Sequence, residues 1–203
     1  ALSFIGIFTI GGLTGLFLGA LATDVHLTDT YFIVAHFHYV MMGSVLMAFL
    51  GGMYYWWPKI TGKMFSDRWG KVACIVIVVG FNVTFFPQFV AGSRGMPRRY
   101  GSYPAKFQHF HVISTFGAYT MGLGLVLVAL NWAHSLARGK KAPANPWGGN
   151  TLEWHTPSPP PHDNFKIQPV VSDPYHLDDW KYDAAIEGWV LVPNLNPSTG
   201  SGH

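Results

Sequence analysis

Two histidines lie two residues apart in an otherwise apolar stretch, "AHFHYVMM" at residues 35–42. An imidazole is costly to bury in hydrocarbon unless its ring nitrogens find partners. Residues two apart in an α-helix project about 200° apart, so His36 and His38 would point to opposite sides of one helix. They would not chelate a single metal ion, as a pair four residues apart can.

This spacing suits two separate ligands, one for each of two cofactors that flank the helix. Neutral imidazole is a common axial ligand of haem iron, and Phe37 would project near the gap between the cofactors. The alternative is that both rings hydrogen-bond to neighbouring helices. This alternative is less favoured for two rings on opposite faces than for a single ring. A second "HFH", at His109–His111, lies near a predicted membrane–water boundary where histidine costs little, and we interpret it as an interfacial feature.

Four apolar stretches are long enough to cross a bilayer core, which takes about 20 helical residues. Of the 203 residues, 49% are hydrophobic and only 11% are charged, which is less charge than soluble domains carry. The alternation typical of a membrane β-barrel is absent. We therefore expect an all-α, polytopic membrane helix bundle with helices at about 1–22, 31–58, 72–90 and 107–137, the third kinked or ended by Pro87.

Composition divides the chain into residues 1–138, the transmembrane four-helix portion that carries the candidate ligands, and residues 139–203, a proline-rich tail. Proline-rich segments favour extended backbone without a packed core, so we expect an irregular tail outside the membrane. The net charge of +3 is too small to indicate nucleic acid. The single cysteine, Cys74, excludes an internal disulfide.

Basic residues in short loops predict the orientation in the membrane. The loop at 59–71 and the residues after the fourth helix hold seven Lys and Arg side chains, against four in the loop at 91–106. The tail is therefore expected on the cytoplasmic side.

Arg98 and Arg99 lie in the opposite loop, within "GMPRRY" at 95–100, on the side where positive charge is disfavoured. The connection after the first helix lies on that side too and carries Asp24 and Asp29. A haem held by either candidate histidine would present its propionates to this layer, and arginine binds carboxylates in bidentate fashion. An ordinary anchor to lipid headgroups is the alternative.

Four motifs occur in a fixed order: "DTYFIVAHFHYVMMG", "NVTFFPQF", "GMPRRYGSYP" and "TLEWHTPSPPP". Together they resemble subunit I of haem–copper cytochrome c oxidases. The resemblance runs from Gly11 to about Phe165 and covers the last four of the family's twelve core helices.

The resemblance implies that His36 is the catalytic axial ligand of the high-spin haem, where oxygen is reduced, and that His38 is an axial ligand of the low-spin haem. Arg98 and Arg99 would bind haem propionates, with Asp24 in the same layer. The two haems would be of types a and a3. The reaction would reduce oxygen to water with electrons from cytochrome c, coupled to proton pumping.

Two departures from the family pattern matter. The family usually has His-Asp before "TY", where this chain has Thr28–Asp29. The lost imidazole weakens the expectation of a magnesium site, for which Asp29 stays the candidate ligand. The copper ligands belong to earlier helices, so copper would be held by the N-terminal part of the subunit. We expect a piece of a longer polypeptide or a subunit split between two genes, inactive alone.

Expected partners are that N-terminal part, oxidase subunits II and III, cytochrome c and the lipid bilayer. A bacterial plasma membrane is favoured over the mitochondrial inner membrane. A membrane dihaem electron-transfer cytochrome is one alternative, although it would need a second deep histidine opposite each low-spin iron. A nitric-oxide-reductase-like relative is another. A transporter or purely structural subunit would leave the opposed histidines unexplained.

Overall fold

The computed structural model describes residues 1–165, 180–184 and 188–191. The chain forms two compact units. The first comprises Ala1–Tyr55 and Phe65–Ala137, and the second comprises Trp56–Met64 and Arg138–His203. The end of one helix, after Tyr55, thus belongs with the tail.

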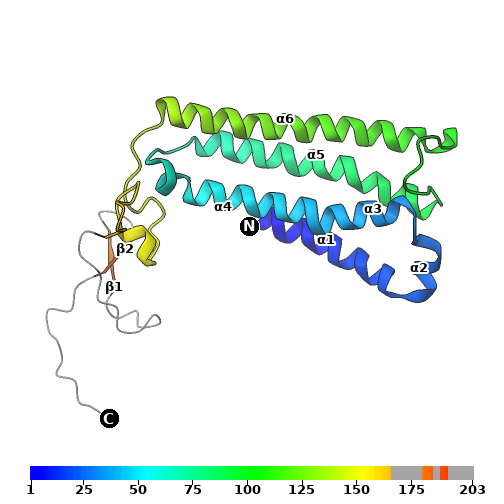
Figure 1. Ribbon diagram of the computed structural model, residues 1–203, viewed down its shortest axis with the longest axis horizontal. Helices are drawn as coiled ribbons and strands as arrows, with labels where there is room; N and C mark the ends of the chain where they lie inside the picture. The colour runs from blue at the N-terminus through cyan, green and yellow to red at the C-terminus, as the bar shows by residue number, and fades with distance from the viewer. Residues whose placement is uncertain (166–179, 185–187, 192–203) are drawn as a thin grey trace, which may run out of the picture. The chain divides into compact units, whose positions relative to one another are not determined.

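The first unit is built from long helices that run side by side (Figure 1). In chain order the helical elements are α1 (Leu2–Gly19), α2 (Leu21–Leu27), α3 (Tyr31–Phe37), the π-helical segment η1 (His38–Gly43), α4 (Ser44–Thr61), α5 (Asp67–Ser93), the 3₁₀ helix η2 (Ala105–Phe107) and α6 (Gln108–Arg138). α3, η1 and α4 follow one another without a break.

Four helical stretches of the described residues are long and apolar enough to cross a membrane: Leu2–Gly19, Tyr31–Thr61, Asp67–Ser93 and Ala105–Arg138. The predicted all-α bundle of four membrane helices is therefore confirmed. Each span satisfies its backbone hydrogen bonds internally, as the hydrocarbon core requires.

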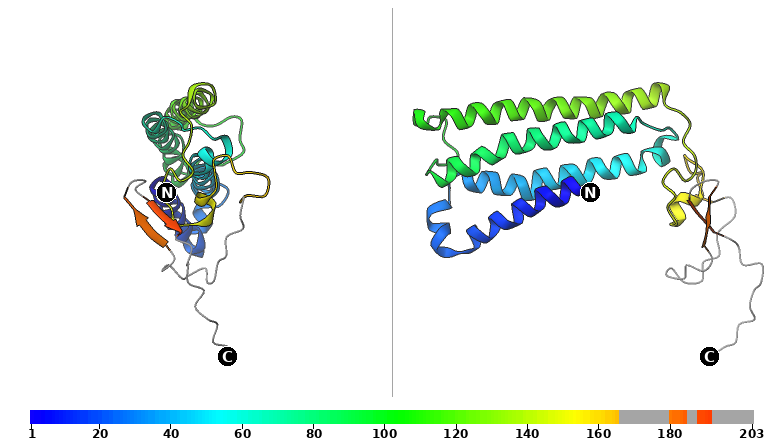
Figure 2. Two further views of the ribbon diagram at one scale, coloured as in Figure 1. Left: turned by 90° about the vertical axis from the view of Figure 1, so that its left-hand side faces the viewer. Right: turned by 180° about the vertical axis from the view of Figure 1, so that it is seen from behind.

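The helices of the first unit lie in the order α6, α5, α3 with η1, and α1 (Figures 1 and 2). Glycines set their spacing. A Cβ atom on Gly117 would overlap the backbone of Thr84, and one on Gly92 would overlap the backbone of Phe32. In lipid, helices associate through packing, and small residues let the backbones approach. These two glycines therefore fix α6 and α3 against α5.

Three local features differ from the sequence-based expectations. α5 begins at Asp67 and continues through Pro87 to Ser93, because a membrane helix tolerates the one donor that a proline removes. The residues between the first two expected helices were expected to form only a connection, but residues 24–27 belong to the short helix α2. The π-helical turn of η1 was not predicted, since one extra residue in a turn barely changes a hydrophobic pattern.

The second unit joins the end of α4 to the start of the tail. The backbone N–H of Ala142 donates to the carbonyl of Gly62 at 2.8 Å, and that of Met64 donates to the carbonyl of Lys140 at 2.8 Å. The described tail also contains the 3₁₀ helix η3 (Leu152–His155) and an antiparallel pair of strands, β1 (Trp180–Asp183) and β2 (Gly188–Leu191).

Lys59 is the buried cation of the second unit, with only 8% of its surface exposed. Its Nζ atom donates to the carbonyl of Thr156 at 2.6 Å and to that of Ala144 at 2.9 Å. It also lies 5.1 Å from the ring centroid of Trp154. A buried ammonium group is tolerable only with partners of this kind. Lys59 therefore ties two tail segments to the end of α4.

We expect Lys59→Met to loosen the tail and to leave the helices of the first unit folded. Methionine keeps the apolar stem but leaves the carbonyls of Ala144 and Thr156 without a donor, which costs about 1–3 kcal/mol for each buried acceptor. Hydrogen exchange of residues 142–158 should accelerate about tenfold or more. Lys140→Met removes an exposed charge and serves as the control. Equal exchange in both variants would contradict the anchoring role.

The tail should also respond to pH through His155. Burial, together with the charge of Lys59, lowers the pKa of this imidazole below its ordinary value of 6.5. Between the two pKa values the unfolded tail binds a proton that the folded tail does not, so folding of the tail is weakened there. Its stability is complete above about pH 6.5 and falls as the pH drops through the folded pKa. Limited proteolysis at decreasing pH measures this loss, and His155→Gln should flatten the dependence.

Candidate functional site

His36 lies near the end of α3, partly buried against α1. Its Nδ1 atom lies 3.1 Å from the hydroxyl oxygen of Thr14. A Cβ atom on Gly15 would come within 3.0 Å of the Cε1 atom of the ring. One face of the imidazole is thus supported by α1, from which one glycine and one threonine approach it.

The hydrogen bonds around Thr14 fix the tautomer of His36. The Thr14 hydroxyl lies 2.8 Å from the carbonyl oxygen of Gly11, which can only accept. The single hydroxyl proton is therefore used there, and the Thr14 oxygen accepts from Nδ1–H of His36. Nε2 of His36 has no hydrogen-bond partner within the described residues.

His38 begins η1 and contacts a different helix. Its Nδ1 atom lies 2.7 Å from the carbonyl oxygen of Val34, so this nitrogen must carry the proton. The ring stacks on Phe85 of α5, with centroids 4.2 Å apart, and on Phe37, at 4.6 Å. In the part of the chain that the structure describes, Nε2 of His38 likewise has no hydrogen-bond partner.

In each imidazole a hydrogen bond holds Nδ1–H, and Nε2 is the nitrogen left for a metal. One ring packs against α1 and the other against α5. A histidine that binds a metal typically does so through one ring nitrogen while a hydrogen bond holds the other nitrogen. No group of three or more His, Cys, Asp or Glu side chains that could hold a metal ion occurs among the described residues. The arrangement fits two irons that each take one ligand from this chain, as haem iron does.

Tyr39 holds η1, the segment that begins at His38, against α5. Its side chain is fully buried, and its hydroxyl donates to Oδ1 of Asn82 at 2.8 Å. The Ser44 hydroxyl donates to the Tyr39 carbonyl at 2.8 Å, five residues back, where the π-helical turn alters the usual pairing. π-Helical turns are frequent at functional sites. This one begins at the second of the two histidines, His38.

The loops beside the start of α3 are joined by Asp29 and Arg98. Nη2 and Nε of Arg98 donate to one carboxylate oxygen of Asp29 at 2.8 and 3.0 Å. The backbone N–H of Arg98 donates to the carbonyl of Asp29 at 2.9 Å, and that of Tyr31 to the carbonyl of Met96 at 3.0 Å. These bonds fix the start of α3, and with it the height of the histidines.

The other predicted residues of this layer stay apart. Arg99 has a positive φ of 66° and an exposed side chain, and no ion pair is found for it within the described residues. Asp24 lies in α2, partly buried, and it too forms no ion pair in the described part of the chain. Phe37 is 37% exposed beside His38.

The contact of Thr14 and Gly15 with His36 was not predicted from the sequence. Thr14 and Gly15 escaped notice because the run "GGLTG" at 11–15 reads as ordinary small residues of a membrane helix. The available signal was the small-xxx-small pattern of Gly11 and Gly15, which predicts a close helix contact.

His111, from the second "HFH", packs between two tyrosine rings. Its ring centroid lies 5.2 Å from that of Tyr31 and 4.3 Å from that of Tyr103.

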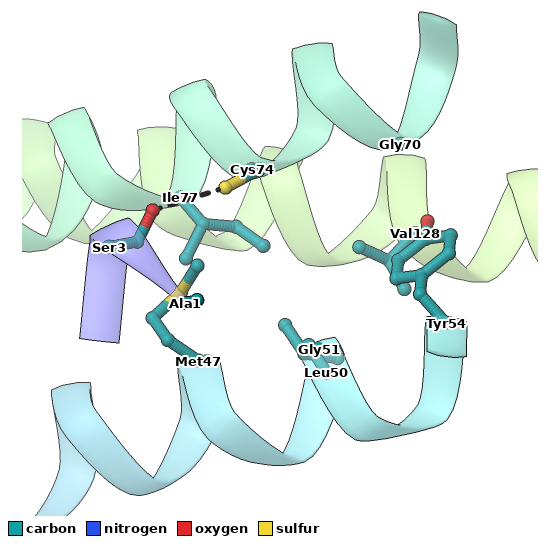
Figure 3. Close-up of a pocket in the computed structure, with 10 residues that line it drawn as sticks. All are labelled: Ala1, Ser3, Met47, Leu50, Gly51, Tyr54, Gly70, Cys74, Ile77 and Val128. Carbon is teal, nitrogen blue, oxygen red and sulfur yellow. Dashed lines mark hydrogen bonds between the residues drawn. The ribbon is translucent and has the colours of Figure 1, made fainter. Parts of the chain in front are cut away.

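A separate apolar pocket lies between α1, α4, α5 and α6 (Figure 3). Its polar groups include Ser3 and Cys74, whose Oγ and Sγ atoms lie 3.3 Å apart, and Tyr54. None of the candidate site residues lines it. The pocket therefore does not form part of the histidine site.

Residues 1–120 match the family model described as Cytochrome C and Quinol oxidase polypeptide I. A heme-copper oxidase subunit I+III of Aeropyrum pernix is 41% identical over 97% of this chain and 25% of that protein. A cytochrome c oxidase subunit 1 of Synechocystis is 43% identical over 84% of this chain and 31% of that protein. The same subunit of Bacillus subtilis is 44% identical over 84% of this chain and 28% of that protein.

The helical arrangement also matches a solved structure. A chain of a heme-copper terminal oxidase dimer, determined by cryo-EM, aligns with a TM-score of 0.62 at 18% identity, over 70% of this chain and 27% of that chain. At this identity the likeness shows the fold alone. The chain spans 25% of the Aeropyrum relative and 31% of the Synechocystis one.

Proposed function

The chain belongs to the cytochrome c and quinol oxidase polypeptide I family, and from this membership we propose that it is the haem-carrying C-terminal part of the catalytic subunit of a haem–copper terminal oxidase. The assembled enzyme would take electrons from cytochrome c, reduce oxygen to water and pump protons. Because the chain spans only 25–31% of the three relatives compared above, this activity would require the N-terminal part of the subunit.

The pair of imidazoles on one helix, each with Nδ1 hydrogen-bonded and Nε2 without a partner among the described residues, supports this proposal most directly. We assign His36, which packs against α1, to the high-spin haem and His38, which packs against α5, to the low-spin haem. When bound, haems of types a and a3 would carry the electrons and, with copper held by the N-terminal part, supply the oxygen chemistry. Phe37 lies between the two ligands in sequence and stacks on His38, so the route between the irons would be short and fixed.

The outer loops would hold the propionates of these haems. Arg98 and Arg99 supply two cations in this layer, and the loop pairing through Asp29 fixes where they stand. Arg99 is free to bind a propionate, whereas Arg98 would share its guanidinium between a propionate and Asp29. Asp24 would contribute to the same layer from α2.

Magnesium fits this layer less well. Asp29 accepts both hydrogen bonds of Arg98 on one oxygen, and Thr28 replaces the imidazole that the family pattern has there. We therefore assign Asp29 to the positioning of Arg98 in preference to a metal.

The partners and the membrane orientation follow from the same proposal. Four membrane helices make the chain a multi-pass membrane protein, and subunit I would assemble with oxidase subunits II and III. Residues 139–203 would lie on the cytoplasmic side of a bacterial plasma membrane, which the excess of Lys and Arg in the 59–71 loop together with the residues after the fourth helix supports. The relatives compared above carry oxidase names, which favours an oxidase over a dihaem electron-transfer cytochrome or a nitric oxide reductase.

Histidine substitutions test the haem assignment in the assembled oxidase. We expect His38→Ala to abolish the low-spin haem spectrum, and His36→Ala to remove carbon monoxide binding at the high-spin iron, because each iron loses its only ligand from this chain. Reduced-minus-oxidised spectra measure both effects. His109→Ala, in the second "HFH", is the control and should leave both spectra intact. Unchanged spectra in both site variants would refute the assignment.

The propionate layer is tested through Arg99. We expect Arg99→Gln to lower a haem midpoint potential by tens of millivolts, because a nearby cation stabilises the reduced haem by roughly 1 kcal/mol in water-like surroundings. Redox titration of the assembled oxidase measures the shift. Arg94→Gln removes the same charge from the same loop, where the Arg94 guanidinium lies over the ring of Phe110. Equal shifts in both variants would show a long-range effect without a propionate contact.

A further inference from the structure

We propose that Thr14 is a positioning residue that fixes the orientation and the tautomer of His36 and strengthens its bond to iron. The inference rests on the proposed function of His36 as a haem ligand. It concerns a hydroxyl group on α1, a helix that supplies no iron ligand of its own in this proposal.

The geometry forms a relay of two hydrogen bonds. His36 donates Nδ1–H to the Thr14 oxygen at 3.1 Å, and the Thr14 hydroxyl donates to the carbonyl of Gly11 at 2.8 Å. Hydrogen bonds in such a chain polarise one another. The carbonyl of Gly11 therefore makes the Thr14 oxygen a better acceptor than an isolated hydroxyl would be.

A comparison within α1 separates this role from routine helix chemistry. Thr9 donates its hydroxyl to the carbonyl of Ile5 at 2.8 Å, which is the usual bond of threonine to its own helix backbone. Thr14 makes the same kind of bond and in addition accepts from a ring 22 residues away. That second bond assigns Thr14 a role beyond its own helix.

The space around the ring supports the same role. Gly15 carries no side chain where a Cβ atom would lie 3.0 Å from Cε1 of His36. A Cβ atom on Gly11 would lie 2.8 Å from Cγ2 of Val40, so the same stripe of α1 also sits close to η1. The hydroxyl thus reaches the ring because α1 approaches it closely.

The relay has a chemical consequence at Nε2. A hydrogen bond from Nδ1–H shifts electron density onto the imidazole and raises its basicity as a ligand. His38 obtains the same effect from the Val34 carbonyl of its own helix, which no side-chain substitution can remove. Only His36 depends on a neighbouring helix, so only His36 can be weakened without touching the ligand itself.

Thr14→Val in the assembled oxidase tests the relay, because valine keeps the shape and removes the oxygen. We expect the iron–histidine stretching frequency of the reduced high-spin haem, measured by resonance Raman spectroscopy, to fall. Its midpoint potential should rise, because a weaker donor favours the reduced iron. Affinity for this haem should fall about 10- to 100-fold, as for other partners of metal-bound histidines. Thr14→Ser should restore all three values, and Thr9→Val should change none.

The possible outcomes separate this inference from the proposed function. If His36→Ala removes the iron–histidine band while Thr14→Val leaves its frequency unchanged, the relay is refuted and the haem assignment stands. If the band survives in His36→Ala, the proposed function itself fails. A loss of haem in Thr14→Ser as complete as in Thr14→Val would show that the helix contact, and not the hydroxyl, supports His36.

Discussion

An imidazole inside a lipid-facing bundle must satisfy its N–H group while keeping one nitrogen free, and this requirement organises the helices around His36 and His38. His38 meets it within its own helix, through the carbonyl of Val34. His36 meets it across a helix interface, through Thr14. An unmet polar group in hydrocarbon is costly, so the position of α1 relative to α3 is tied to the chemistry of one ring.

Close helix packing makes that arrangement possible. Gly92 leaves room for the backbone of Phe32, and Gly117 leaves room for that of Thr84. Helices that approach this closely form many van der Waals contacts, which is the main attraction available between apolar surfaces in lipid. The same contacts place Phe85 of α5 under the ring of His38. The glycines therefore help to position the two histidines.

The two ends of the helices are held by charge in different ways. Beside the start of α3, Arg98 and Asp29 join two loops through an ion pair in which Asp29 is largely exposed to solvent. In the second unit, the ammonium group of Lys59 is buried and bound by backbone carbonyls. An exposed pair contributes little to stability, whereas a buried cation is strongly coupled to its partners. Arg98 can thus exchange Asp29 for a ligand more readily than Lys59 can exchange its carbonyl partners.

The sequence alone determined the four apolar spans, the opposed histidines and the family, because length, hydropathy and motif order are local properties of the chain. It did not determine that α5 runs through Pro87, that a π-helical turn begins at His38, or that Arg98 pairs with Asp29 and leaves Arg99 apart. These features depend on which helix lies beside which. Thr14 shows the reason most plainly: its residue type is ordinary for a membrane helix, and only the packing of α1 against α3 brings its hydroxyl to His36.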